Sequence, residues 1–458
     1  MDTRSKALEY ANSHQKLFMD NLISLVRIPS VSTAPEHKGD MQKTAEWLSE
    51  RLTSLGMKNV QIMPTGGHPV VFAECKAAGE TKPTVLIYGH YDVQPVDPID
   101  LWKTPPFEPT QIGDNLFARG ASDMKGQVIA TLNAIESVMQ AGDPPVNMKF
   151  IFEGEEEIGS PNLVPFIEKH KDLLACDVAL NPDSGMIDDK TPTITYALRG
   201  MAYFELRIYG PKQDLHSGLF GGAVHNPAVV LADLIAGMHD DQWRVTLPGF
   251  YDKVRSLSDQ ERIELARLPL TEDYYLQQTG APALYGEAGY TPAERVGGRP
   301  TLDVNGLLSG FTGVGSKTVL PAYAMAKISM RLVPDQNPHE VEKQLIAYLN
   351  EKTPPTVRWE ITNLSAGWAS ISDINHPATR AMVEGLEAAW GIKPLYKRDG
   401  GSVPVVADMQ RILGVDSVLT GFGLADDNIH APNEKLHLPT WQKGTNALIH
   451  FFYNYGNV

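Results

Sequence analysis

The chain contains very little cysteine, since Cys75 and Cys176 are the only two among its 458 residues. Two cysteines cannot supply a disulfide framework or a thiolate metal site, so any bound metal needs nitrogen and oxygen ligands. The sequence also lacks a continuous run of about 20 apolar residues and an apolar stretch of signal-peptide length near its start. We therefore expect a cytoplasmic protein that does not enter a membrane.

Positive charge is scarce relative to negative charge. The sequence has 40 Lys and Arg residues against 55 Asp and Glu residues, which gives a formal net charge of −15. This balance argues against nucleic acid or an anionic membrane as the main partner, because both repel an acidic surface. Cationic metal ions and small peptides remain compatible partners.

The length of the chain predicts two domains, because 458 residues exceed what one hydrophobic core usually supports. Apolar strands and helices of α/β character occupy residues 1–199 and return in residues 367–458. Between them, residues 200–366 show alternating, half-buried strands separated by helices, a pattern typical of an inserted α+β sandwich. Within this insert, residues 240–300 form a helical excursion to which we assign no chemistry.

One acidic stretch directly follows an expected strand. The apolar run at residues 148–151 leads to Glu153 and then to three consecutive carboxylates, Glu155, Glu156 and Glu157. A buried strand that ends in three carboxylates concentrates like charge at a sheet edge, which is costly unless cations or protons offset it. The ordinary alternative is a solvated acidic loop, and we expect Glu155 to be exposed.

A histidine and an aspartate follow the apolar strand expected at residues 84–88. His90 and Asp92 are two positions apart, and alternate residues of an extended chain share a face. A histidine that binds metal through one ring nitrogen needs a partner for the other, and Asp92 is a candidate. The alternative is an ordinary hydrogen-bonded loop histidine.

Two more carboxylates and another histidine stand near expected turns. Asp123 precedes an apolar helix expected at residues 127–139, where the usual role of Asp is the helix N-cap. Asp183 follows a short apolar run, and His430 lies in a polar loop. Each position taken alone has a structural explanation.

Together, these nitrogen and oxygen donors define a candidate metal site at the strand ends of one α/β domain. Donor sets without thiolates suit zinc, manganese or cobalt. A pair of ions about 3.5–4 Å apart also needs a carboxylate that bridges them. The donors are His90, Asp123, Glu157, Asp183 and His430.

Six motifs in this order resemble those of one peptidase family. The chain is similar to the carnosinase and cytosolic nonspecific dipeptidase branch of the aminoacylase-type di-zinc metallopeptidases, a family that includes acetylornithine deacetylase and succinyl-diaminopimelate desuccinylase. The similarity runs from about residue 29 to the C-terminus. The motifs are GHYDVQP at 89–95, LW and PPF within 101–107, GASD at 120–123, EGEEEIGS at 153–160, LHSG at 215–218 and HAPNE at 430–434.

The resemblance implies a zinc-peptidase-like catalytic domain, with a mixed sheet flanked by helices, and an inserted α+β sandwich that serves as lid and dimerisation domain. It implies two divalent ions per subunit, zinc first and manganese or cobalt as alternatives. His90 and Asp183 would hold one ion, Glu157 and His430 the other, and Asp123 would bridge the two.

The resemblance also implies a mechanism. Asp92 would orient His90, and Glu156 would be the general base that deprotonates a water activated by the two metal ions. His216, in the lid motif, would reach the active site of the partner subunit in a homodimer and stabilise the oxyanion. The reaction would be hydrolysis of the amide bond of a dipeptide.

Substrate contacts are implied in the lid and in a glycine-rich turn. Arg331 would bind the substrate carboxylate, and Thr318 would assist from across the dimer. Backbone amides at Gly401 and Ser402 would face the substrate, with Asp399 near its free amine.

Two positions depart from the family pattern. Met124 follows the bridging aspartate, where many relatives have Asp or Asn and a cis peptide bond. Asp399 stands where the dipeptidase branch usually has Glu, and the shorter arm could alter which N-terminal residue is accepted.

Two other functions remain open. An N-acyl amino acid amidohydrolase, or deacylase, would use the same metal mechanism, although the context of residues 97–107 favours a dipeptidase. A non-catalytic relative that uses the fold for binding would be expected to lack a ligand or the base, but all five ligand positions and Glu156 are filled.

Overall fold

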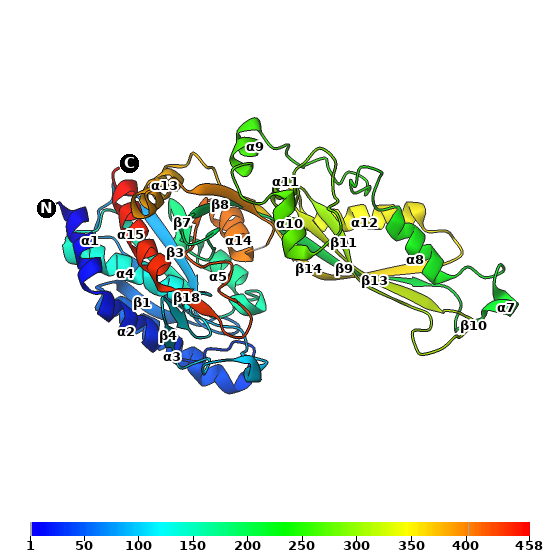
Figure 1. Cartoon of the computed structure of the whole chain (residues 1–458), viewed down its shortest axis with the longest axis horizontal. Coiled ribbons are helices and arrows are strands. Elements are labelled where there is room, and N and C mark those ends of the chain that lie inside the picture. The colour runs from blue at the N-terminus through cyan, green and yellow to red at the C-terminus, as the bar shows by residue number, and fades with distance from the viewer. Residues whose placement is uncertain (1, 402) are drawn as a thin grey trace. The chain divides into compact units, whose positions relative to one another are not determined.

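The structure is a computed structural model that describes residues 2–401 and 403–458. The chain divides into two compact units (Figure 1). The first unit comprises Met1–Tyr196, Ser372–Tyr396 and Val405–Val458. The second unit comprises Ala197–Ile371 and Lys397–Pro404. The main boundaries therefore fall a few residues from those expected at 199 and 366.

The short segment 397–404 groups with the second unit, whereas we expected it in the first. Arg398 forms an ion pair with Glu261. Arg199 donates its backbone N–H to the Asp399 carbonyl at 3.3 Å and its Nε–H to the Gly400 carbonyl at 3.2 Å. These contacts to residues of the second unit explain the assignment, which periodicity along the chain does not reveal.

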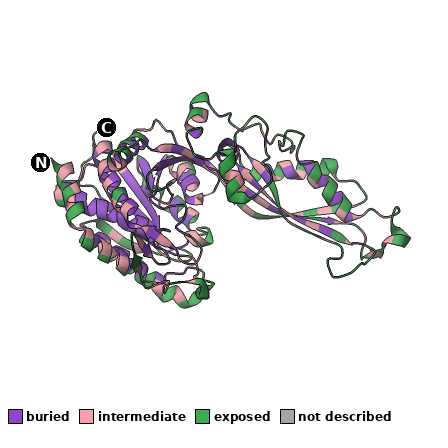
Figure 2. Ribbon diagram, viewed as in Figure 1, coloured by how far each residue is buried: buried purple, intermediate pink, exposed green. Residues whose placement is uncertain are grey.

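A mixed sheet forms the core of the first unit, as expected. Its parallel pairs are β3 with β6, β3 with β7, and β7 with β17, while the outer pairs are antiparallel. The apolar strand expected at residues 84–88 is β3, and it is buried along nearly its whole length (Figure 2). The strand order is β1 (Lys58–Met63), β2 (Val70–Cys75), β6 (Asn147–Glu153), β3 (Thr84–His90), β7 (Val178–Asn181), β17 (Ser417–Leu419), β8 (Thr193–Leu198) and β15 (Ser370–Ile371), and β16 (Leu395–Asp399) also pairs with β8.

Helices flank this sheet, and α4 is the most deeply buried of them, in contact with α1, α2, α15 and β3. Among the described residues, no helix combines the length and the apolar character that crossing a membrane requires. The helices are α1 (Thr3–Ser13), α2 (Gln15–Val26), α3 (Lys38–Ser54), α4 (Lys125–Ala141), α5 (Leu163–Lys169), α6 (Lys171–Leu174), α13 (Pro377–Trp390), α14 (Pro404–Leu413) and α15 (Leu438–Tyr455). Short 3-10 turns are η1 (Pro35–His37), η2 (Ile99–Leu101) and η3 (Glu156–Ile158).

Helix α13 illustrates how the local sequence sets an element's ends. Pro377 occupies the first turn, where its missing N–H is not needed. The side chain of His376 accepts a hydrogen bond from the Ala378 N–H, and Gly391 ends the helix with a φ of +77°. A smaller sheet also lies in this unit, with the order β18 (Lys435–His437), β5 (Asn115–Phe117) and β4 (Thr110–Ile112). Strand β16 (Leu395–Asp399) crosses from the first unit into the second.

The second unit is an α+β sandwich, as expected. Alternate residues of β9 are buried, and α8 and α12 contact β9 on the apolar face of the sheet. The antiparallel order is β11 (Thr301–Ser309), β13 (Tyr323–Leu332), β9 (Gly200–Tyr209) and β14 (Arg358–Gly367). Two short strands, β10 (Leu215–His216) and β12 (Val319–Leu320), form a separate antiparallel pair. The helices are α7 (Ser217–Phe220), α8 (Pro227–Ala236), α9 (Asp259–Leu265), α10 (Glu272–Thr279), α11 (Pro292–Gly298) and α12 (Pro338–Lys352).

Candidate metal centre

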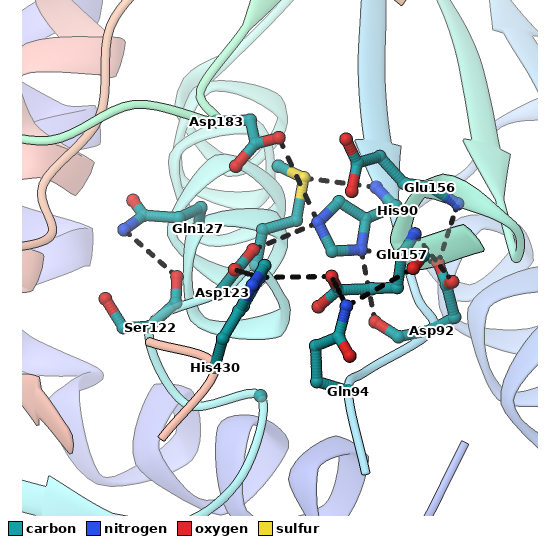
Figure 3. Close-up of polar contacts among 12 residues, drawn as sticks. His90, Asp92, Gln94, Ser122, Asp123, Gln127, Glu156, Glu157, Asp183 and His430 are labelled. Carbon is teal, nitrogen blue, oxygen red and sulfur yellow. Dashed lines mark hydrogen bonds and ion pairs between the residues drawn. The ribbon is translucent and has the colours of Figure 1, made fainter. Parts of the chain in front are cut away.

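The candidate ligands of the first unit come from segments that follow the strands of the mixed sheet. His90 is the last residue of β3, Glu157 lies in η3 just after β6, and Asp183 follows β7 by two residues. Because β3, β6 and β7 are parallel, their carboxyl ends meet at one edge of the sheet, where α/β proteins place ligands. Asp123, just before α4, and His430, from the loop before β18, reach the same place (Figure 3).

Asp123 stands between two histidines. Its Oδ1 lies 3.1 Å from Nε2 of His90, and its Oδ2 lies 2.9 Å from Nε2 of His430. The alternative role of Asp123 as a helix N-cap is not found, because the N-cap residue of α4 is Met124 and no side chain caps that helix. The peptide bond between Asp123 and Met124 is cis. One carboxylate oxygen therefore faces each histidine.

Each histidine has a second carboxylate nearby. Asp183 Oδ2 lies 3.9 Å from Nε2 of His90, and Glu157 Oε2 lies 3.1 Å from Nε2 of His430. One donor atom each from His90, Asp123 and Glu157 also lie within 4.8 Å of one another. Two ligand atoms on one tetrahedral ion lie about 3.3 Å apart when the bonds are about 2 Å. The donors and their spacing thus fit divalent metal ions.

Asp92 holds both His90 and the turn that carries the glutamates. The Nδ1 of His90 lies 3.1 Å from the Asp92 carbonyl oxygen and 3.4 Å from its carboxylate, where we expected an orienting partner. The same carboxylate accepts the backbone N–H of Glu156 at 3.2 Å and that of Glu157 at 3.1 Å. This second contact was not anticipated from the sequence. The buried carboxylate of Asp92 therefore contacts both His90, a candidate ligand, and the backbone of Glu156, the candidate base.

Burial dominates the acid–base properties of two carboxyl groups. It raises the pKa of Glu156 to about 7, with Glu157 adding to the effect and His90 opposing it. Burial also raises the pKa of Asp183 to about 8, again with His90 in opposition. A carboxyl group that titrates near neutral pH is suited to exchange protons during catalysis.

Hydrogen bonding dominates at the bridging position. Burial favours a higher pKa for Asp123, but the hydrogen bonds from His430 and His90 outweigh it and lower that pKa. The hydrogen bonds to Asp123 and Glu157 raise the pKa of His430 to about 10. To bind a metal ion through Nε2, each of these histidines would have to give up the proton at that nitrogen, so metal binding at this site would release protons.

Gln94 is a contact residue that sequence reasoning did not single out. Its side-chain Nε2–H donates to Oε2 of Glu157 at 2.8 Å and lies 3.2 Å from the Glu157 carbonyl oxygen. The only available signal was its position two residues after Asp92, in a motif that was quoted without a role for Gln94. This hydrogen bond from Gln94 helps to orient the carboxylate of Glu157, a candidate ligand.

Glu155 is buried, with 5% of its surface exposed, so our expectation of an exposed residue was wrong. Its Oε1 accepts the His68 N–H at 3.1 Å, and its Oε2 accepts a hydrogen bond from the Asn162 side chain at 2.8 Å. These contacts join the loop before β2 to the turn at η3. Glu155 therefore has a structural explanation separate from the ligands.

In the second unit, His216 lies on β10, and Thr318 directly precedes β12, the strand that pairs with β10. His216 pairs with Val319, and the Ser217 N–H donates to the Thr318 carbonyl at 3.0 Å. The Gly218 N–H donates to Nδ1 of the His216 ring at 3.0 Å. An Nδ1 that accepts leaves the ring proton on Nε2, so this exposed histidine can donate from Nε2.

The remaining predicted substrate residues also belong to the second unit. Arg331 lies on β13 and pairs with Thr301 and Met201 on the neighbouring strands. The Asp399 carboxylate accepts a hydrogen bond from the Gly401 N–H at 3.0 Å and forms an ion pair with Lys397 at 3.1 Å. These contacts outweigh burial and lower the pKa of Asp399. Ser402 lies outside the described residues.

The chain belongs to Peptidase family M20/M25/M40, which it matches over residues 86–454. The family resemblance inferred from the motifs is thereby confirmed. The chain is 31% identical to the Beta-Ala-His dipeptidase of Homo sapiens, over 98% of this chain and 92% of that protein. It is 32% identical to the Cys-Gly metallodipeptidase dug1 of Schizosaccharomyces pombe, over 99% of this chain and 98% of that protein.

A solved structure has a similar fold. The M20 family metallo-carboxypeptidase Sso-CP2 from Sulfolobus solfataricus matches with a TM-score of 0.83 and 34% identity, over 96% of this chain and 99% of that one. This similarity covers both units of the chain.

Proposed function

We propose that this protein is a metal-dependent dipeptidase that hydrolyses the amide bond of unblocked dipeptides. The observation that carries the proposal is the position of Asp123, which presents one oxygen to His90 and the other to His430. Family membership and the similarity to two enzymes named as dipeptidases support it further.

The proposed ligands form two groups, one at each oxygen of the Asp123 carboxylate. His90 and Asp183 would hold one ion, Glu157 and His430 the other, and Asp123 would be shared. Zinc is the first candidate, with manganese and cobalt as alternatives, because the donors are nitrogen and oxygen only. When bound, two such ions polarise a substrate carbonyl and make a water molecule easier to deprotonate.

Glu156 would move the protons of the reaction. Its carboxylate would accept a proton from the attacking water and deliver it to the leaving amine nitrogen, so that the amide bond breaks to an acid and an amine. A pKa near 7 suits a group that must both accept and donate. Asp92 would keep this group in place through the backbone N–H of Glu156.

The second unit would act as lid and dimerisation domain of a homodimer. His216 of the partner subunit would donate its Nε2–H to the developing oxyanion, and Thr318 would assist from across the dimer. Arg331 would bind the substrate carboxylate, since a guanidinium matches a carboxylate fork. Asp399 would bind the free amine, with the Gly401 backbone nearby. The contribution of Ser402 and the cytoplasmic location stay predictions.

A metallo-carboxypeptidase is the second candidate, favoured by the 34% identity to Sso-CP2. Such an enzyme needs a free substrate carboxylate but accepts residues before the scissile bond. A deacylase would share the metal site and accept N-acyl amino acids.

A hydrolysis panel separates these candidates. The protein, loaded with zinc, manganese or cobalt, is assayed on unblocked dipeptides, the same dipeptides N-acetylated, N-acetyl amino acids and unblocked pentapeptides. We expect cleavage of unblocked dipeptides, with the blocked and longer compounds at least tenfold slower, because those compounds leave Asp399 without the free amine that it would bind. Release of C-terminal residues from pentapeptides at similar rates would establish the carboxypeptidase instead, and preference for N-acetyl amino acids would establish the deacylase.

A further inference from the structure

Glu434 is a fully buried carboxylate in the loop that carries His430. Its Oε2 accepts hydrogen bonds from Nη1 of Arg119 at 2.7 Å and from the Gly120 N–H at 2.9 Å. Its Oε1 accepts the Ser122 N–H at 2.9 Å and the Asp123 N–H at 3.0 Å. One side chain thus binds three backbone amides and one guanidinium of the segment that ends in Asp123.

This arrangement depends on the local backbone. Gly120 has a φ of +82°, a value that other residues rarely adopt, in the segment whose amides at residues 120, 122 and 123 turn toward a single anion. Burying a carboxylate is costly unless charged and polar donors surround it. Among the residues that the structure describes, the donors to the Glu434 carboxylate all come from the segment that holds Asp123.

A second carboxylate of the same loop contacts the same segment. Asp427 is fully buried, and its Oδ2 accepts the Ser122 Oγ–H at 2.7 Å and the Leu424 N–H at 2.8 Å. Asp427 and Glu434 flank His430 in the sequence. The loop of His430 is therefore joined to the segment of Asp123 on both sides of the histidine.

We propose that Glu434 is a positioning residue that sets the place of the Asp123 carboxylate relative to His430. Its carboxylate accepts the backbone N–H of Asp123, and it lies four residues after His430 in the same loop. Glu434 therefore links the backbone of Asp123 to the loop that carries His430. The proposal rests on the proposed function, because it concerns the same metal site. Since Asp123 would be shared by both ions, loss of Glu434 is expected to weaken both binding events.

The alternative is a buried ion pair that contributes only to folding, and Glu287 offers a matched control. Glu287 is buried, with 8% of its surface exposed, and its carboxylate accepts hydrogen bonds from Arg299 at 2.6 and 2.7 Å. Both carboxylates are thus paired with a buried arginine. Glu287 belongs to the second unit and is no part of the metal site.

The test compares Glu434→Gln, Glu287→Gln and the unmodified protein, each stripped of metal and titrated with zinc by calorimetry. Cobalt absorption spectra report the ligand geometry. We expect Glu434→Gln to lose about 10- to 100-fold in affinity for both ions and to change the cobalt spectrum. Glu287→Gln is expected to bind zinc with unchanged affinity, despite a comparable fall in Tm.

Wild-type affinity for both ions and an unchanged cobalt spectrum in folded Glu434→Gln would overturn the proposal. Should Glu434→Gln fail to fold, Glu434→Asp keeps the negative charge but shortens the arm. It is expected to fold and to lose affinity for both ions, and wild-type binding by this variant would equally overturn the proposal. Failure of the unmodified protein to bind two ions would contradict the proposed function itself, so the two failures are distinguishable.

Discussion

The Glu156→Gln variant is expected to lose about 10² to 10⁴ in kcat for dipeptide hydrolysis while it keeps two metal ions per chain. Glutamine has the shape of glutamate but cannot accept the proton of the attacking water. The backbone N–H that Asp92 holds at 3.2 Å is unchanged by the substitution, so the turn should keep its place. Steady-state kinetics together with elemental analysis of bound metal measure both effects.

Glu155→Gln is the matched control for this variant. Glu155 is the adjacent carboxylate and is buried, but its contacts are to His68 and Asn162 rather than to the candidate ligands. We expect Glu155→Gln to lower Tm and to leave kcat within a few fold of the unmodified protein. Near-normal turnover by a Glu156→Gln protein that contains two ions would remove Glu156 from the role of base.

The His216→Ala variant is expected to lose about 10² to 10³ in kcat, the usual effect of removing one oxyanion donor. The Gly218 N–H occupies Nδ1 of this ring, so Nε2 carries the proton that would be donated. Metal content should be unchanged, because His216 belongs to the second unit and all the candidate ligands to the first.

Mixing His216→Ala chains with Glu156→Gln chains tests whether His216 acts across a homodimer. In a mixed dimer, one site would combine an intact Glu156 with an intact His216 of the partner subunit, and the other site would lack both. Random exchange at equal concentrations is expected to restore roughly a quarter of wild-type activity. Each variant incubated alone is the control. Mixed dimers confirmed by mass spectrometry, without recovered activity, would show that His216 does not act in trans.

The sequence allowed the placement of candidate residues near strand ends to be predicted. His90 follows a continuous apolar strand, and Glu157 follows another, so the parallel pairing of β3 and β6 brings them to one sheet edge. The sandwich of the second unit was likewise visible in the alternation of β9. Such patterns involve residues that are close in sequence, so they can be recognised without knowledge of the tertiary structure.

Other features depend on contacts between distant parts of the chain. Asp123 has the local signature of a helix cap, but its carboxylate instead contacts His90, 33 residues earlier, and His430, 307 residues later. Glu155 sits in an acidic run, yet a loop 87 residues earlier buries it. Glu434 binds amides more than 300 residues away, which no periodicity could indicate.

The most direct test of the account is to titrate the metal-free protein with zinc while following hydrolysis of an unblocked dipeptide and the number of ions bound. We predict no turnover in the presence of a chelator and a rise in rate that saturates when two ions are bound per chain. Full turnover by protein that demonstrably contains no metal, or saturation at a single bound ion, would contradict the two-ion site formed by His90, Asp123, Glu157, Asp183 and His430.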